Sequence, residues 1–294
     1  MSETKNERVT VLKTHKLFIK GAYPRGESGR THALRDAEGG LLAHLCTGSR
    51  KDTREAVEAA RAALPGWSSA TPFLRGQILY RLAEMLESRA MEIQSAIQET
   101  TGRSAKKARA EVSAGIDRIV CFAGWSDKIA SMLGNQNPVA QPFYNFTTPE
   151  PVGTIGVISP ETPSFLGFLS LWLPAVCAGN TVVCMASETW PLPALLVAES
   201  MPNSDLPAGV FNLITGLRKE LLPVFASHRD LDGLIACADT KESVGLRELS
   251  ADNLKRLRLI APDSDFECDR TWEGPTSFRG SVEYKTVWHP MSVE

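Results

Sequence analysis

The stretch GTIGVIS, residues 153–159, begins the part of the chain that decides the fold. It is a short and almost continuously apolar run, which is typical of a strand buried on both of its faces. Four similar runs follow it, with helical segments between them: NTVVCMA (180–186), VFNLIT (210–215), GLIAC (233–237) and LRLIA (257–261). Five such strands alternating with helices predict an α/β fold with a doubly wound parallel sheet over residues 153–264.

Residues 1–136 have a different texture, in which β-prone runs give way to helical periodicity. Over residues 16–49 the β-prone runs are punctuated by glycine pairs, which predicts a β-meander. Apolar residues then recur at helical spacing, and proline or glycine marks where each helix should end. The expected helices are 51–64, stopped by Pro65-Gly66, 71–102, closed by Gly102, and 104–134, closed by Gly134. We therefore expect N-terminal strands and helices ahead of the parallel sheet.

Two extended segments lie on either side of the predicted sheet. The first, residues 137–152, is interrupted by prolines, which favours edge strands over central ones. The second, residues 281–289, alternates β-branched and aromatic residues as a strand does. The linker before it, residues 265–280, contains no alternating run with which this strand could form a hairpin. An unpaired strand leaves backbone donors and acceptors open, so the last strand needs a partner.

Composition excludes several classes of function. The net charge of −2 gives no electrostatic basis for binding nucleic acid or an anionic membrane. No apolar run reaches the length that crosses a membrane, and the first 16 residues lack the apolar core of a signal peptide. The six cysteines are scattered without the spacing of a metal site, and so we expect reduced thiols, no metal and a cytoplasmic location.

The order of these motifs resembles the NAD(P)-dependent aldehyde dehydrogenase superfamily. The similar stretches are AVEAARAALPGW (56–67), EPVGTIGVISP (150–160), LPAGVFNLITG (206–216) and SVEYKTVW (281–288). The resemblance runs from about Lys16 to Leu259 and again over Ser281–Trp288. It implies that residues 153–264 form a Rossmann-like cofactor domain. It further implies that the 137–152 segment is a hairpin whose sheet the C-terminal strand joins, as a small β element for oligomerisation.

The same resemblance implies that the catalytic part is missing. In the family, a general-base Glu and then a domain-sized block with the catalytic Cys follow the fifth strand. Here only residues 265–280 separate the sheet from the last strand, whereas a domain needs at least about 50 residues. The general-base position falls on Ile260, and Thr162 stands where the family has an oxyanion-stabilising Asn. We therefore expect no catalytic residue in this chain.

The cofactor positions are also altered. The resemblance leaves Ser159, Glu188 and Gly216 as vestigial NAD(P) contacts, and Glu188 could equally serve as a capping or solvated residue. Met185 replaces the ribose-binding Lys, and Asp239 brings a carboxylate to the place of a diphosphate, which opposes its binding. No cofactor is therefore expected, and weak NAD(P) binding is the alternative.

Two features have an interpretation of their own. Asp239 is followed three residues later by Glu242, which is the spacing of a helix capping box. Cys268 is the only thiol near the missing block, and its neighbours Asp265, Glu267 and Asp269 are expected to raise its pKa and disfavour a nucleophilic thiolate. It is therefore interpreted as an exposed linker cysteine.

These observations lead to one main hypothesis and two alternatives. The main hypothesis is a non-catalytic subunit that assembles with a full-length aldehyde dehydrogenase, or with another copy of itself, through Ser281–Trp288 and the 137–152 segment. The alternatives are a residual NAD(P)-binding protein and an NAD(P)-dependent aldehyde oxidoreductase. Phe266, Trp272 and Phe278 further suggest that residues 265–280 fold back as a lid over the sheet, where the missing block would lie.

Overall fold

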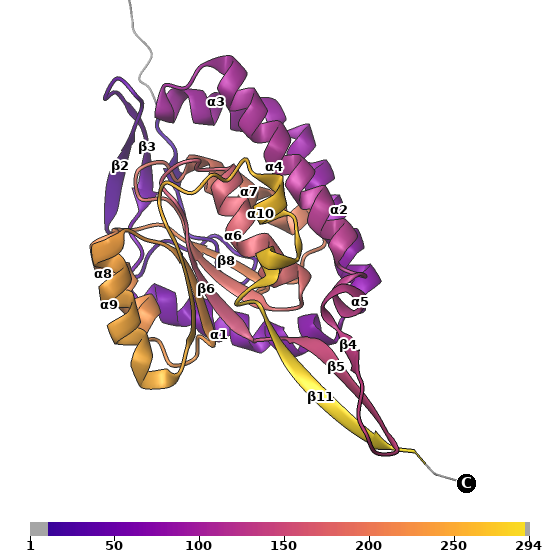
Figure 1. Ribbon diagram of the computed structural model, residues 1–294. Coiled ribbons are helices and arrows are strands. Elements are labelled where there is room, and N and C mark those ends of the chain that lie inside the picture. Colours follow the sequence, from indigo (N-terminus) through magenta and orange to yellow (C-terminus); the bar gives the residue numbers. More distant parts are fainter. Residues whose placement is uncertain (1–10, 292–294) are drawn as a thin grey trace, which may run out of the picture.

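The computed structural model describes residues 11–291 and contains three sheets, of which the central one is flanked by helices (Figure 1). Residues 1–10 and 292–294 are outside the described part, and so the expectation of an N-terminus without a signal peptide falls largely outside it. No helix in the described part is both long enough and apolar enough to cross a membrane.

The central sheet has five parallel strands in the order β10-β9-β6-β7-β8. The strands are β6 (Thr154–Ile158), β7 (Thr181–Met185), β8 (Phe211–Ile214), β9 (Gly233–Cys237) and β10 (Arg256–Ile260). The five predicted strands are confirmed, with ends that differ by at most one residue. Every residue of β6 to β9 is buried, because both faces of the sheet are covered.

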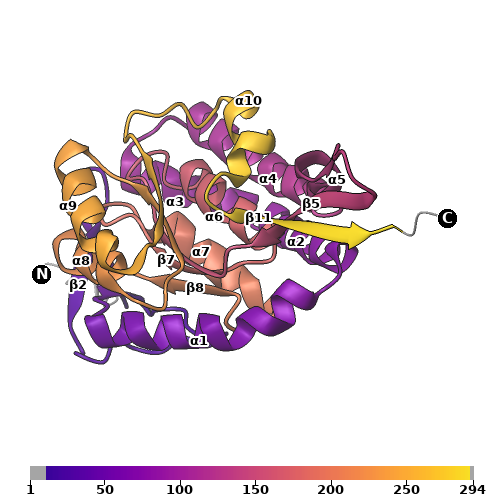
Figure 2. The ribbon, with the colours of Figure 1, turned by 60° about the horizontal axis from the view of Figure 1, so that its bottom comes forward.

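Helices lie on both faces of this sheet, and the predicted doubly wound fold is thus confirmed. The long helices are α1 (Arg50–Ser69), α2 (Pro72–Ser88), α3 (Ala90–Thr101), α4 (Ala105–Trp125), α6 (Leu166–Cys177), α7 (Leu192–Ser200), α8 (Arg218–Ser227) and α9 (Thr240–Ser250). Figure 2 shows α1 along one face and α6 with α4 on the opposite one. Neighbouring residues of a strand enter different cores: Val157 packs with the α6 side, whereas Ile158 packs with the α1 side.

The predicted end of the first helix is wrong, because α1 continues to Ser69 with Pro65 inside it. The side chain of Trp67 is buried in the last turn, and its indole Nε1 donates a hydrogen bond to the carbonyl of Val176 at 2.9 Å. This tertiary packing stabilises the turn beyond Pro65, although proline removes one backbone donor from the helix.

The two predicted long helices are each divided. The first breaks at Arg89, whose guanidinium bonds Glu92 and reaches the carbonyl of Leu196 on α7 at 3.1 Å. The second ends at Trp125, and a short helix, α5 (Ile129–Leu133), follows after a turn. Periodicity continues across both breaks, and so the sequence pattern alone does not reveal them.

The N-terminal sheet is not a simple meander. It has the order β1-β3-β2 and consists of β1 (Thr14–His15), β2 (Thr31–Arg35) and β3 (Leu41–Cys46). Strands β2 and β3 form the expected antiparallel hairpin, whereas β1 runs parallel to β3. A meander would have placed all three strands antiparallel.

The third sheet contains the last strand of the chain and has the order β11-β5-β4. It consists of β4 (Asn135–Asn137), β5 (Phe143–Pro151) and β11 (Val282–Pro290), and it projects from the body as an arm (Figure 1). β11 pairs with β5 over nine antiparallel residue pairs. The last strand therefore finds its first partner within its own chain, as the resemblance implied for the 137–152 segment.

The prediction that the proline-containing segment forms only edge strands is wrong for β5, which lies between the two others. The bond from the Met291 N–H to the Pro142 carbonyl shows which pairs exchange backbone hydrogen bonds. Alternation from that pair directs the nitrogens of Pro149 and Pro151 away from β11 and toward the side of β4. β4 begins opposite Thr147 and pairs no further toward Pro149, and so neither proline interrupts the ladder.

Residues 261–281 fold back over the body through two short helices, α10 (Asp269–Trp272) and a 3₁₀ turn at Pro275–Phe278. Phe266, Trp272 and Phe278 are all buried, as the lid hypothesis requires. The guanidinium of Arg118 on α4, itself inaccessible to solvent, donates to the carbonyl of Phe266 at 3.0 Å and pairs with Asp269 at 3.2 Å. The lid is thus fastened to the helical layer by both apolar packing and charge.

Candidate functional site

The carboxyl edge of the parallel sheet is where an open α/β sheet offers a crevice, at the point where the winding direction reverses. Here β6 and β9 are neighbours, and the helices that follow them lie on opposite faces of the sheet. Ser159 is the first residue after β6, and Asp239 is the second residue after β9. The loops after β7 and β8 bring Glu188 and Gly216 to the same edge.

A side chain of the protein itself crosses this crevice. Arg218 is the first residue of α8, and its guanidinium donates to the carbonyl of Ser159 at 3.2 Å and to that of Cys237 at 2.9 Å. One cation therefore joins the ends of two neighbouring strands. Its side chain is 16 % exposed, so the crevice around it is largely closed to water.

Carboxylates hold Arg218 in place. The Nε and Nη2 atoms donate to the two oxygens of Glu242 at 2.9 and 2.8 Å, in the bidentate geometry that suits a guanidinium. Glu161 lies 3.7 Å from Nη1. Burial by itself lowers the pKa of Arg218, but the bonds to Glu242 and the charge of Glu161 raise it above its ordinary value. Arg218 is thus a fixed cation at all physiological pH values.

The structure brings the three predicted cofactor positions together around this arginine, but it uses their polar groups internally. The hydroxyl of Ser159 donates to the carbonyl of Met185 at 2.6 Å. The carboxylate of Glu188 accepts the backbone N–H of Arg218 and so caps the start of α8. A side chain at Gly216 would come within 2.7 Å of Leu221, which leaves glycine as the residue that fits there.

The predicted capping box is confirmed. Asp239 accepts a bond from the Glu242 N–H at 2.8 Å, and the carboxylate of Glu242 accepts one from the Asp239 N–H at 3.2 Å. Glu242 thus serves both the N-terminus of α9 and the guanidinium of Arg218. The positive end of this helix is occupied by protein carboxylates.

Sequence reasoning missed Arg218 and Glu161. The oxygens of Glu161 accept bonds from the hydroxyl of Ser187 at 2.5 Å and from the backbone of Thr189 at 3.0 Å, so it organises the loop after β7. A signal for Arg218 was present, because a helix rarely begins with a cation against its own positive end. The sequence does not show which acceptors outweigh that repulsion.

The hydroxyl at the oxyanion position is also engaged. Thr162 accepts a bond from Arg103 at 3.0 Å, and Arg103 in turn pairs with the buried carboxylate of Glu111. Glu111 accepts the N–H of Phe165 at 2.9 Å. This chain of bonds fixes the loop after β6 as a structural unit.

The thiols differ in character. Burial raises the pKa of Cys237 to about 11, with Glu242 adding to the effect. The expectation for Cys268 is wrong in direction, because a bond from the Thr271 hydroxyl lowers its pKa and outweighs the opposing charge of Asp265. It is also half-buried at the start of α10 rather than fully exposed.

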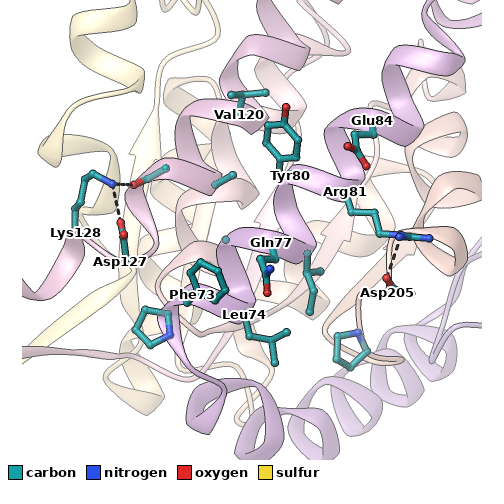
Figure 3. A pocket seen from close by; sticks show the side chains of 16 residues that line it. Phe73, Leu74, Gln77, Tyr80, Arg81, Glu84, Val120, Asp127, Lys128 and Asp205 are labelled. Atoms are coloured by element: carbon teal, nitrogen blue, oxygen red, sulfur yellow. Dashed lines mark hydrogen bonds and ion pairs between the residues drawn. The ribbon is translucent and has the colours of Figure 1, made fainter.

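Two further features of the described chain lie away from this crevice. Between residues 11 and 291, no group of three or more His, Cys, Asp or Glu side chains is arranged to hold a metal ion. A cavity of 970 Å³ lies between α2 and α4 and is lined by side chains such as Phe73 and Tyr80 (Figure 3). Both cations that line it are paired, Lys128 with Asp127 at 2.7 Å and Arg81 with Asp205 at 3.0 Å, and none of its lining residues belongs to the parallel sheet.

Comparison with known proteins shows the family to which this chain is similar. A model of the aldehyde dehydrogenase family matches residues 24–261. An aldehyde dehydrogenase of Emericella nidulans is 32 % identical over 247 residues, which are 83 % of this chain and 49 % of that protein. Retinal dehydrogenase 2 of Gallus gallus is 30 % identical over 84 % of this chain and 48 % of its own length. The chain thus spans about half the length of the relatives it matches.

Solved structures similar to this chain cover the same share of it as these relatives do. PnpE from Pseudomonas sp. WBC-3 superposes with a TM-score of 0.81 at 28 % identity, over 84 % of this chain and 51 % of its own. HpcC from Thermus thermophilus gives 0.81 at 27 % identity, over 84 % and 48 %. PnpE has also been solved in complex with nicotinamide adenine dinucleotide. With its parallel sheet, its flanking helices and a match over most of its residues, this chain belongs to the aldehyde dehydrogenase family.

Proposed function

We propose that this chain is a non-catalytic member of its family, a pseudoenzyme subunit that assembles with an active aldehyde dehydrogenase. The observation that carries the proposal is the crevice at the carboxyl edge of the sheet, which is filled by Arg218 and its carboxylate partners. A domain built to receive a dinucleotide leaves that space open and its helix N-terminus free for phosphate.

The residues present do not fit NAD(P). The Glu188 carboxylate is engaged with the backbone of Arg218, and the Ser159 hydroxyl is engaged with Met185. Asp239 occupies the N-terminus of α9, where a diphosphate would meet a carboxylate. Binding would require several internal bonds to break, and so we derive no reaction through this cofactor.

The region after the sheet supports the same proposal. In the family, the resemblance places the general base and the catalytic Cys after the fifth strand. Here the residues between β10 and β11 form the lid, whose aromatic side chains Phe266, Trp272 and Phe278 are packed into the body. Cys268 lies on this lid, where its sulfur accepts a bond from the hydroxyl of Thr271 at 3.4 Å.

The assembly surface we propose is the outer edge of β11. The alternation that begins at Met291 turns the backbone groups of Val282, Tyr284, Thr286 and Trp288 away from β5. No strand pairs with that edge in the described part of the chain. Tyr284 and Trp288 are each 58 % exposed, and an edge with exposed aromatics is suited to take a strand from a second subunit.

The partner and the compartment are part of the proposal. A full-length aldehyde dehydrogenase is favoured because the family resemblance of Ser281–Trp288 concerns its own oligomerisation sheet. The family match ends at residue 261, so that resemblance remains a prediction. All six cysteines are free thiols, which supports a reducing compartment such as the cytoplasm.

The decisive experiment is capture of the tagged chain from its host, with native mass spectrometry of the complex. We expect a stoichiometric complex with a full-length aldehyde dehydrogenase. The Thr286→Pro variant removes an outward-facing N–H of β11 and the hydroxyl that bonds Thr147 at 3.0 Å, but it keeps the backbone bonds of β11 to β5. It should therefore fold yet fail to capture that partner. A wild-type chain that is monomeric, or that forms only complexes of identical copies, would contradict the proposed partner.

The two alternatives can be tested beside it. A residual NAD(P)-binding protein would release heat on titration with millimolar NAD, and an oxidoreductase would form NADH from aldehyde. The second activity would also have to disappear in a Cys268→Ala variant. The filled crevice leads us to expect neither signal from the purified chain.

A further inference from the structure

The central parallel sheet also has an edge with no neighbouring strand in the described chain, the outer side of β10. β10 is the last strand of the parallel sheet, and only β9 lies beside it. A groove of 940 Å³ runs along its free side, between β10, the lid and the start of β11. This groove lies along the free edge of β10, and it meets the outer edge of β11 only at the start of that strand, at Val282 and Tyr284.

The register shows which backbone groups face the groove. The N–H of Arg256 donates to Asp232, and the carbonyl of Ile260 accepts from Ala238, so even-numbered residues of β10 face β9. The odd-numbered residues Leu257 and Leu259 therefore direct their N–H and C=O groups outward. Within residues 11–291 these outward groups have no hydrogen-bond partner.

Rigid side chains form the walls. Trp272 stacks on Phe266 with a centroid distance of 4.6 Å, and its indole donates to the carbonyl of Asp265 at 2.8 Å. Phe278 lines the same groove from the lid, and Tyr284 lines it from β11. A groove with fixed aromatic walls and an open strand edge suits an extended peptide better than a compact ligand.

The charge of the groove is one-sided. Arg256, Arg258 and Arg279 line it, and no Asp or Glu does. Arg256 pairs with Glu283 at 2.7 Å, whereas Arg258 and Arg279 have no carboxylate partner in the described chain. Arg258 lies over the Trp272 ring at 5.5 Å and donates to the carbonyl of Ser277 at 2.6 Å. Arg258 and Arg279 thus line the groove together without a carboxylate partner among the described residues. Burial and the nearby Arg279 lower the pKa of Arg258 to about 10, which still leaves it charged at neutral pH.

We infer that this groove docks an extended acidic segment of a partner protein, which adds to the sheet as a sixth strand beside β10. Backbone bonds to Leu257 and Leu259 would hold the segment, and Arg258 with Arg279 would select carboxylates on it. The inference goes beyond assembly through β11, because it concerns a different edge and a different partner chemistry.

The test uses the purified full chain and a short fluorescein-labelled peptide in which valine and glutamate alternate. Fluorescence anisotropy should show saturable binding that weakens as salt is added. A peptide that alternates valine and lysine is the matched control and should not bind. Arg279→Gln should weaken binding about tenfold, the effect of losing one charge-assisted hydrogen bond, whereas Arg109→Gln on the distant α4 should leave it unchanged.

Leu259→Pro tests the strand edge itself. It removes an outward N–H and trims a partly buried side chain that packs on the core, but it keeps the bonds of β10 to β9. The chain should therefore fold and lose the peptide, and circular dichroism of the variant checks the fold. Equal binding of the acidic and basic peptides would overturn the inference, as would unchanged binding to the Leu259→Pro and Arg279→Gln variants. Concentration-dependent dimers that Leu259→Pro abolishes would also overturn it, since the occupant would then be a second copy.

Discussion

Arg218 shows how one residue can close a crevice that the rest of the fold would form. It begins α8 against the positive end of that helix, and four groups compensate for this. It donates to two backbone carbonyls and to the carboxylate of Glu242, and the carboxylate of Glu161 lies 3.7 Å away. Its replacement by alanine would leave Glu242 without its bidentate partner. We expect a loss of about 1.5–3 kcal/mol in the free energy of unfolding, the usual worth of a hydrogen bond to a charged group.

The measurement is urea unfolding followed by circular dichroism. Arg30→Ala serves as the control, because Arg30 forms an exposed ion pair with Glu220 and should matter little. Equal stability of the Arg218→Ala variant and the wild type would contradict the role given to this arginine.

Lys255 provides a prediction for pH. It precedes β10 in the chain, and its buried side chain reaches the C-terminal end of α8. Its ammonium donates there to the carbonyls of Phe225, Ala226 and His228. Burial lowers its pKa from 10.5 to about 8 in the folded state. Between these values the unfolded chain binds more protons, so this group makes the protein more stable as pH rises through that window.

A series of urea unfolding curves from pH 7 to pH 10.5 tests this, with Lys255→Met as the reference. The unfolding free energy of the wild type minus that of the variant should increase with pH above about 8. A difference that is constant or that shrinks would show that Lys255 is not held with a lowered pKa.

At the scale of elements, the lid contributes the buried aromatic side chains Phe266, Trp272 and Phe278 to the core of the body. Trp272 is buried and stacked on Phe266, and Arg118 ties the lid to α4. Trp272→Ala should destabilise the chain by about 3–5 kcal/mol, the usual cost of deleting a buried indole. The control is Trp288→Ala, at an exposed tryptophan of β11, which should lower the stability far less. Thermal melts of both variants check this, and equal decreases in melting temperature would contradict the role given to the lid.

The arm formed by β4, β5 and β11 allows its register to be tested by a pair of prolines. Lys285 faces β5 with its N–H, whereas the N–H of Thr286 faces outward. Lys285→Pro should therefore weaken the arm and expose it to proteolysis, whereas Thr286→Pro should leave it protected. Limited proteolysis followed by mass spectrometry reads out the difference, and reversed protection would place the register one residue off.

At the scale of the whole molecule, ligand binding and stability are linked. A ligand at free concentration c that binds only the folded state stabilises it by RT ln(1 + c/Kd), and so raises the melting temperature. Because Arg218, Glu188 and Asp239 close the crevice from inside, millimolar NAD should leave the melting curve of the wild-type chain unchanged. A clear upward shift would favour the residual cofactor-binding alternative over the pseudoenzyme proposal.

Much of this protein follows from local patterns. Apolar runs such as 153–159 determine the strands, and the Asp239-Glu242 spacing determines a cap, because each depends only on residues near in sequence. Tertiary structure decided the rest. Trp67 extends α1 past Pro65 through a bond to Val176, and β11 pairs with a strand from a distant part of the chain. Arg218 finds its acceptors on β6, β9 and α9. These contacts join distant segments, and no short stretch of sequence records which partners the packed fold will bring within bonding distance.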